Sequence, residues 1–269
     1  MTVQINYKSN NVKKTSGNLV LFIDDKINIS SLKKEITKSE YAYISDLIDI
    51  NDKKKEILTY DISSKRKIIL IVIKKNLTVS ESESLGAKFY DYFKDNKKYN
   101  FTINTDTNPS KLKNFIAYFL HGLRLKSYNF EKYKSKKEKK ATSINLIGKN
   151  KPTKIDQVKF KAIEEGAFFA RDLVSEPGNV LHPDEYAKRI NTLKKFGLKI
   201  NVLDEKKCKK LGMNALLGVG QGSVRGSYLI TIEWNGAKNN SKPLAFVGKG
   251  VCFDTGGYSL KPAKFMEDM

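Results

Sequence analysis

Residues 67–73, which read KIILIVI, decide the fold class of this chain. After Lys67 the stretch is an unbroken run of apolar, mostly β-branched side chains, and Lys74 and Lys75 close it. Such side chains favour strands, and the run falls far short of the roughly 20 residues that a membrane-spanning helix needs. The stretch therefore predicts a strand buried in a protein core.

Strand-like and helix-like segments alternate on both sides of this stretch. Further strands are predicted at residues 18–23 (NLVLFI), 99–103 (YNFTI) and 143–147 (SINLI). Helical spacing of apolar residues predicts one helix at 84–94 and another that opens at Pro109 and extends to Leu123. Alternating strands and helices are typical of an α/β layer with a mostly parallel sheet.

The second half of the chain also has an α/β pattern. An amphipathic helix is predicted at residues 155–174, followed by the stop signal Ser175-Glu176-Pro177-Gly178. We place a domain boundary at residues 150–155, which gives an N-terminal α/β domain at 1–150 and a second domain at 151–269 with this helix as the link. The remaining predicted elements are helices at 183–196 and 206–211 and strands at 198–203, 215–219, 228–234 and 244–247.

The composition supports folded domains with an unusual charge. Hydrophobic residues make up 40% of the chain, and 50 basic residues against 29 acidic ones give a net charge of +21. This excess fits either a nucleic-acid site or a lysine-rich solvated surface. We favour the surface, because lysine is spread along the chain and the densest run, residues 132–140, contains no arginine. Salt-sensitive, non-specific association is expected in either case.

Cysteine usage points to a reducing compartment. Cys208 and Cys252 are the only cysteines, and they form neither a CxxC pair nor a disulfide framework. Residues 1–11 contain no apolar segment typical of a secretory signal. We therefore expect a cytoplasmic protein without a membrane-spanning segment.

A glycine-rich stretch at residues 218–223 (GVGQGS) raises the alternative of a dinucleotide site. The full fingerprint needs a third glycine at fixed spacing and a helix that starts there, whereas residues 224–233 have the pattern of a strand. The phosphate-binding pattern GxxxxGK[ST] is absent from the sequence. Neither nucleotide site is therefore favoured.

The segment most suggestive of chemistry is residues 247–262, VGKGVCFDTGGYSLKP. It follows a predicted buried strand and places Lys249, Asp254 and Lys261 among glycines that permit tight turns. Ligands in open α/β sheets bind at the carboxyl ends of strands, where a carboxylate and two amines would here lie together. An ordinary glycine-rich turn with solvated lysines is the alternative, and composition alone leaves both open.

The segment resembles the metal-binding signature of the leucyl (cytosol) aminopeptidase family, GKG-x-x-F-D-[ST]-G-G-x-S-[IL]-K, at every fixed position. Residues 170–179 (ARDLVSEPGN) resemble the family segment R-x-L-x-N-x-P-x-N, with Ser175 where asparagine is commonest. Residues 213–223 (MNALLGVGQGS) resemble M-x-x-[LF]-L-x-V-x-x-G-S. The three matches occur in the family's order and cover residues 155–269, whereas the first 150 residues match only in architecture.

The resemblance implies a macro-like N-terminal α/β domain followed by the first part of an α/β/α zinc-exopeptidase-like domain. It implies two divalent metal ions, Zn²⁺ or Mn²⁺, with Lys249 as a ligand of one and Asp254 bridging both. It assigns Lys261 as the catalytic lysine and places Met269 against the substrate's first side chain. Peptides with a free N-terminus would be the substrates, and the intact protein would form a homohexamer.

Physical chemistry agrees with these assignments. A lysine binds a metal only as a neutral amine, so its pKa must fall well below the usual value of about 10.4. A bridging carboxylate offsets the repulsion between two cations, and a protonated Lys261 would stabilise the negative charge of a tetrahedral intermediate. His121 and His182 are not needed for this chemistry, and we expect structural roles for both.

The family's site also needs acidic ligands that would follow Met269, and the sequence does not contain them. We therefore expect an N-terminal part of a truncated member that is inactive by itself. Two alternatives stay open: a non-catalytic remnant or assembly protein, and a basic nucleic-acid-binding protein, because some members of the family also bind DNA.

Overall fold

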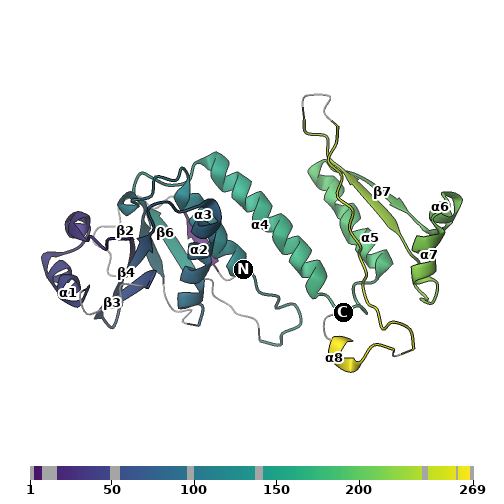
Figure 1. Ribbon diagram of the computed structural model, residues 1–269, viewed down its shortest axis with the longest axis horizontal. Coiled ribbons are helices and arrows are strands. Elements are labelled where there is room, and N and C mark those ends of the chain that lie inside the picture. Colours follow the sequence, from purple (N-terminus) through teal and green to yellow (C-terminus); the bar gives the residue numbers. More distant parts are fainter. Residues whose placement is uncertain are drawn as a thin grey trace. The chain divides into compact units, whose positions relative to one another are not determined.

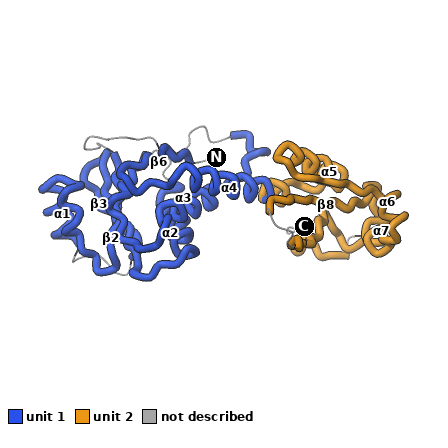
Figure 2. The backbone as a smooth tube through the Cα atoms, turned by 90° about the horizontal axis from the view of Figure 1, so that it is seen from above, with its two compact units in different colours: residues 1–170 blue, residues 171–269 orange. Residues whose placement is uncertain are grey.

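The computed structural model describes residues 3–7, 17–48, 55–95, 100–136, 142–237, 242–258 and 260–266. The chain divides into two compact units, an N-terminal unit of residues 1–170 and a C-terminal unit of residues 171–269 (Figure 2). The division falls within α4 (Lys154–Ser175), the helix that was expected to link two domains. None of the helices in the described ranges combines the length and apolar character needed to cross a bilayer.

The N-terminal unit contains a six-stranded sheet with the order β1-β6-β5-β2-β4-β3. All neighbouring strands are parallel except β3 and β4, which are antiparallel. The predicted α/β fold with a mostly parallel sheet is therefore confirmed. The strands are β1 (Val3–Asn6), β2 (Asn18–Asp24), β3 (Ile57–Ser63), β4 (Arg66–Ile73), β5 (Phe101–Asn104) and β6 (Thr142–Ile147).

Strand β4 is buried on both of its faces. Its side chains alternate between two cores: Ile69 and Ile71 belong to one cluster, and Ile68 and Leu70 to the other. Helices α2 (Val79–Phe93) and α3 (Phe115–Lys126) cover the first face, while the short helix η1 (Ser30–Lys34) and α1 (Lys38–Ile48) lie at the second (Figure 1). A strand without a polar face requires such cover on both sides.

Helix α3 starts later than the sequence predicted. Pro109 does not open it; the helix begins at Phe115, after Asn114 in a left-handed conformation with φ of 62°. The backbone N–H of Ser110 donates to the Asn108 side chain, and that of Leu112 donates to the Ser110 hydroxyl. These local side-chain hydrogen bonds compete with helical ones and delay the helix.

Helix α4 packs on α3 through a largely buried polar contact. The Glu164 carboxylate lies 3.1 Å from Nδ1 of His121 and accepts a 3.2 Å hydrogen bond from Nε of Arg124. The ring of Phe160 lies against the His121 ring. Burial, reinforced by the negative charge of Glu164, raises the pKa of the nearby Tyr7 to about 12. The expected structural role of His121 agrees with these contacts.

The C-terminal unit is built around a small antiparallel sheet of two strands, β7 (Lys199–Leu203) and β8 (Leu229–Glu233). The strands predicted at residues 215–219 and 244–247 are both wrong. Residues 215–219 lie in helix α7 (Asn214–Gly220), because a short apolar run does not by itself distinguish a strand from a helix. The other helices are α5 (Pro183–Asn191), η3 (Thr192–Phe196), α6 (Glu205–Lys210) and α8 (Ala263–Met266).

The second wrong prediction is the strand at residues 244–247. This segment has no regular structure, and the exposed fractions of Leu244, Phe246 and Val247 are 81%, 90% and 99%. A strand needs a neighbour for its backbone hydrogen bonds, and within the described ranges β8 pairs only with β7. An apolar run alone therefore did not produce a strand.

Helices α2 and α3 approach each other closely at two glycines. A Cβ atom added to Gly122 would lie 1.9 Å from the backbone oxygen of Glu83, and one added to Gly86 would lie 1.9 Å from that of Phe119. Gly166 on α4 has nothing within 4 Å of the same position. Replacing a helical glycine by alanine stabilises the helix by about 1 kcal/mol when there is room for the methyl group. The substitution at Gly166 therefore measures helix propensity alone, and those at Gly86 and Gly122 add the cost of the steric clash.

We expect Gly122→Ala to lower the free energy of unfolding by about 2–3 kcal/mol, because α2 must move away from α3. The matched control Gly166→Ala should raise it by about 0.5–1 kcal/mol. Urea unfolding followed by circular dichroism measures both. Equal effects of the two substitutions would contradict close packing at Gly122.

The buried Glu40 carboxylate is paired with Arg66 beside β4. Nε of Arg66 lies 2.5 Å from Oε1 of Glu40, and the backbone N–H of Thr37 donates to Oε2 at 2.8 Å. Burial raises the pKa of Glu40, but the hydrogen bonds and positive charge of its partners outweigh burial and leave the pKa below its usual value. The stability from this lowered pKa is present above the unfolded pKa of about 4.3 and is lost as the pH falls through the folded value.

We therefore expect Glu40→Gln to cost about 1–2 kcal/mol of unfolding free energy at pH 7, since the charged partner is lost. The difference from the wild type should shrink as the pH falls below about 4. Denaturant unfolding at a series of pH values tests this, with the exposed Glu165→Gln as the control. A cost that is constant across the pH series would refute the ion pair.

Candidate functional site

The residues predicted to carry the chemistry lie on one loop of the C-terminal unit. Nζ of Lys261 lies 2.8 Å from Oδ2 of Asp254, and the backbone N–H of Gly256 donates to Oδ1 at 2.7 Å. Both carboxylate oxygens of Asp254 therefore accept a hydrogen bond from within the loop. Lys249 is exposed on the same segment.

A tight glycine turn folds Lys261 back onto Asp254. Gly256 and Gly257 have φ angles of 75° and 126°, which other residues rarely adopt. The backbone N–H of Lys261 donates to the carbonyl of Thr255 at 3.0 Å, and the Thr255 hydroxyl donates to the carbonyl of Gly257 at 2.5 Å. The two glycines of the sequence motif thus permit the contact between the lysine and the carboxylate.

The electrostatics of Asp254 reflect this loop. The hydrogen bond from Lys261 and that from the Gly256 N–H hold the pKa of Asp254 below its usual value, and the charges of Lys261 and Lys249 add to the effect. The Asp254 side chain is 43% exposed and that of Lys261 is 29% exposed. A carboxylate that stays ionised and open to solvent is suited to bind a cation. Met269, the fourth predicted site residue, lies outside the described residues.

The segment before Asp254 packs on the turn that follows α4. A Cβ atom added to Gly178 would lie 2.9 Å from Cβ of Phe253 and 3.2 Å from the carbonyl oxygen of Cys252. Only glycine allows this approach without a shift. The stretch 170–179 and the stretch 247–262, recognised separately in the sequence, therefore meet in the C-terminal unit.

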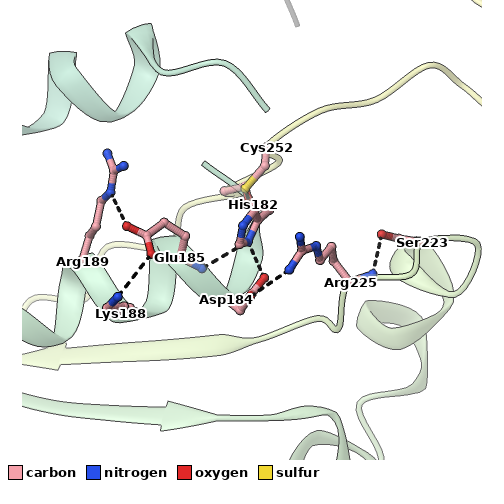
Figure 3. A network of polar contacts seen from close by, with 9 residues as sticks. His182, Asp184, Glu185, Lys188, Arg189, Ser223, Arg225 and Cys252 are labelled. Atoms are coloured by element: carbon pink, nitrogen blue, oxygen red, sulfur yellow. Dashed lines mark hydrogen bonds and ion pairs between the residues drawn. The ribbon is translucent and has the colours of Figure 1, made fainter. Parts of the chain in front are cut away.

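A polar network at the start of α5 joins the third sequence motif to this region. His182 caps the helix, with Nδ1 accepting from the backbone N–H of Glu185 at 3.4 Å and also contacting the Asp184 carboxylate. Figure 3 shows Asp184 between His182 and Arg225, whose Nη1 donates to Oδ2 of Asp184 at 3.2 Å. The backbone N–H of Arg225 donates to the Ser223 hydroxyl at 3.0 Å. The structural role expected for His182 is therefore that of a helix cap.

The same helix is anchored to the end of α4 by Arg189. Its Nη1 donates to Oε1 of Glu176 and its Nε donates to Oε1 of Glu185, both at 3.0 Å. Glu176 is buried, so its charge requires such a partner. Helix α5 thus has a fixed position beside the loop that carries Lys249 and Asp254, and Tyr186 on α5 lies 3.9 Å from the position of a Cβ on Gly250.

Sequence reasoning missed the network of Asp184 and Arg225. Acidic residues directly after Pro183 are typical of the first turn of a helix, and this is the only signal that the sequence contains for Asp184. Nothing in the sequence marked Arg225 as its partner, since the two residues meet only through the fold.

Asp254 and Lys249 are the candidate metal ligands among the described residues. No group of three or more His, Cys, Asp or Glu side chains in the described ranges is placed to hold a metal ion. Asp254 offers a carboxylate that could bridge, and Lys249 offers an amine that binds a metal once neutral. This donor set fits some of the ligands of a two-metal centre and leaves the others to be supplied.

Comparison with known proteins identifies the C-terminal part of the chain. Residues 168–269 match the model described as "Cytosol aminopeptidase family, catalytic domain". A probable cytosol aminopeptidase of Bradyrhizobium sp. is 47% identical over 154 residues, which are 55% of this chain and 31% of the relative. The probable cytosol aminopeptidase of Caulobacter vibrioides is 49% identical over 157 residues, which are again 55% of this chain and 31% of the relative.

Solved structures of this kind share the fold at low sequence identity. A mutant of tomato leucine aminopeptidase superposes with a TM-score of 0.73 at 21% identity. The superposition covers 94% of this chain and 55% of the tomato chain. The cytosol aminopeptidase of Coxiella burnetii gives 0.71 at 19% identity, covering 98% and 53%. The bottromycin maturation enzyme BotP in complex with Mn gives 0.67 at 17%, covering 93% and 51%.

The aligned part spans about a third of the length of the curated relatives, and the chain spans about half of each solved structure. The matched segment contains all three motifs and the loop that joins Asp254 to Lys261. Residues 168–269 are therefore similar to the catalytic domain of the cytosol aminopeptidase family.

Proposed function

We propose that this chain contributes Lys249, Asp254 and Lys261 to the dinuclear metal site of a leucyl-type aminopeptidase, which hydrolyses the first peptide bond of peptides. The observation that carries the proposal is the contact between Asp254 and Lys261 inside the segment that matches the family's catalytic domain. Two residues that the motif assigns to one site touch in the fold although seven positions separate them.

Each residue has a distinct role in the proposed site. Asp254 would bridge the two ions, Lys249 would bind one of them as a neutral amine, and Lys261 would place positive charge beside the oxygen of the scissile carbonyl. When bound, the metal ions would supply a nucleophilic hydroxide near neutral pH and a Lewis acid for the carbonyl. Met269 would line the pocket for the substrate's first side chain.

The substrate class follows from the exopeptidase assignment. A free α-amine would be required for binding, so peptides with an unblocked N-terminus are the proposed substrates. The ions would be Mn²⁺ or Zn²⁺, and the Mn bound to the structural neighbour BotP supports the first. We also propose a cytoplasmic location, in line with the relatives' names, and a homohexamer for the intact enzyme.

The 269 residues would not complete this site by themselves. Two ions need several carboxylate ligands, whereas the loop offers only Asp254 among the described residues. We therefore propose that the chain alone lacks peptidase activity. A non-catalytic remnant or assembly protein is the second candidate, and the same incomplete ligand set supports it.

We expect no measurable hydrolysis of a leucyl anilide by the 269-residue chain at any concentration of Mn²⁺ or Zn²⁺ up to 10 mM, since the ligand set is incomplete. Release of the coloured amine, followed by absorbance, measures this. Turnover that Lys261→Ala abolishes and that Lys264→Ala preserves would show that the chain is complete for catalysis.

A chimera tests the site in a complete enzyme. Residues 1–269 would be joined to the remaining length of the Caulobacter vibrioides relative. We expect metal-dependent hydrolysis of leucyl anilide, none of its N-acetylated form, and a loss of at least 10²-fold in kcat on Lys261→Ala because the oxyanion loses its cation. Lys264→Ala is the control of matched charge, and a folded but inactive chimera would favour the non-catalytic remnant.

A further inference from the structure

The ion pair between Lys261 and Asp254 has a consequence for metal binding. A carboxylate that bridges two cations uses the lone pairs of its oxygens to bind them. Here Oδ2 is paired with the Lys261 ammonium at 2.8 Å, and Oδ1 accepts from the Gly256 N–H at 2.7 Å. The group assigned to bind metal is therefore already bonded to the group assigned to catalysis.

We propose that Lys261 is an internal counter-ion that competes with metal for Asp254, so that metal binding and release of the lysine are one coupled event. The inference rests on the proposed function, because it needs Asp254 to be a metal ligand. It gives Lys261 a second role, since the same ammonium group closes the metal-free site and becomes available to a substrate only when the metal is bound.

Electrostatics favours such an exchange. A divalent ion that approaches Asp254 meets the like charge of Lys261 at hydrogen-bond distance from the same oxygen, and two cations cannot occupy that position together. Removing the ammonium group of Lys261 removes the competitor and its share of the repulsion, while the charge of Lys249 stays. Lys261 therefore lowers the affinity of the loop for metal, whereas a lysine that does not contact Asp254 would affect it far less.

The geometry of the loop allows the lysine to move. The Asp254 carboxylate is partly open to solvent, so an ion reaches it without unfolding the loop. The backbone of Lys261 is fixed by its hydrogen bond to the Thr255 carbonyl, while its four-carbon side chain has several rotamers. The ammonium group can leave Asp254 and stay within the site, which is where catalysis needs it.

The competition predicts that only one of two neighbouring lysines affects the affinity for metal. We expect Lys261→Met to bind Mn²⁺ at least tenfold more tightly than the wild-type 269-residue chain, measured by the free Mn²⁺ signal in electron paramagnetic resonance. Lys264→Met removes the same charge from exposed α8 and should change the affinity by less than about twofold. Lys261→Arg keeps the cation and should bind as the wild type does, and Asp254→Asn should abolish the gain in the Lys261→Met background.

A second measurement needs no substitution at the site. Acetylation of the wild-type chain with limiting reagent, followed by mass spectrometry, reports which lysine amines are free. We expect acetylation of Lys261 to rise at least threefold when Mn²⁺ is added, while that of Lys264 stays constant. Circular dichroism of each variant confirms that it is folded.

The outcomes separate this inference from the proposed function. Equal Mn²⁺ affinity in the wild type and Lys261→Met, with Asp254→Asn still weakening it, overturns the competition and leaves the metal site intact. Absence of Mn²⁺ binding in every variant overturns the competition, and the activity of the chimera then decides the proposed function separately. Tighter binding of Lys261→Met together with increased acetylation of Lys261 establishes the exchange.

Discussion

Burial of β4 on both of its faces is the constraint on which the N-terminal unit depends. Ile68, Ile69, Leu70 and Ile71 are fully buried and alternate between two cores, so neither side of the sheet can face water. Helices α2 and α3 must cover one side and η1 and α1 the other, and the close approach at Gly122 fixes how α3 lies on α2. Helix α4 then attaches through Glu164, whose buried charge is held by Arg124 and His121.

The C-terminal unit buries fewer apolar side chains than the N-terminal unit and exposes more of them. Its sheet has two strands, and the apolar side chains of Leu244, Phe246 and Val247 face solvent within the described ranges. A few apolar side chains are buried in this unit, such as Leu181, Ile190 and Ile200. Polar contacts add to them: Arg189 joins α5 to Glu176, and Asp184 joins α5 to Arg225. The loop from Lys249 to Lys261 is stabilised by its own hydrogen bonds and by contact with the turn at Gly178. Local order at Asp254 therefore does not require a large core.

Several elements could be predicted from the sequence because one physical factor, such as burial of an apolar run or the backbone freedom of a glycine, determines each of them. The apolar run of β4 and the strand β2 beside it were predicted nearly to the residue, as was the end of the 183–196 helical segment at Gly197, whose φ of 83° only glycine adopts readily. Predictions failed where two factors compete. Side-chain hydrogen bonds around Ser110 delayed α3, and the apolar run at 215–219 formed a helix. The short edge strand β1 carried too weak a pattern to be recognised.

The sequence by itself determined the α/β class and contained the three motifs, because residue type and spacing along the chain encode these directly. Through its resemblance to a known family it also predicted Lys249, Asp254 and Lys261 as site residues. Only the tertiary structure decided which of these groups touch. The left-handed turn at Gly256 and Gly257 brings Lys261 onto Asp254, and the fold pairs Asp184 with Arg225 across 41 positions. Contacts of this kind depend on distances in space, and the spacing of residues along a chain does not record them.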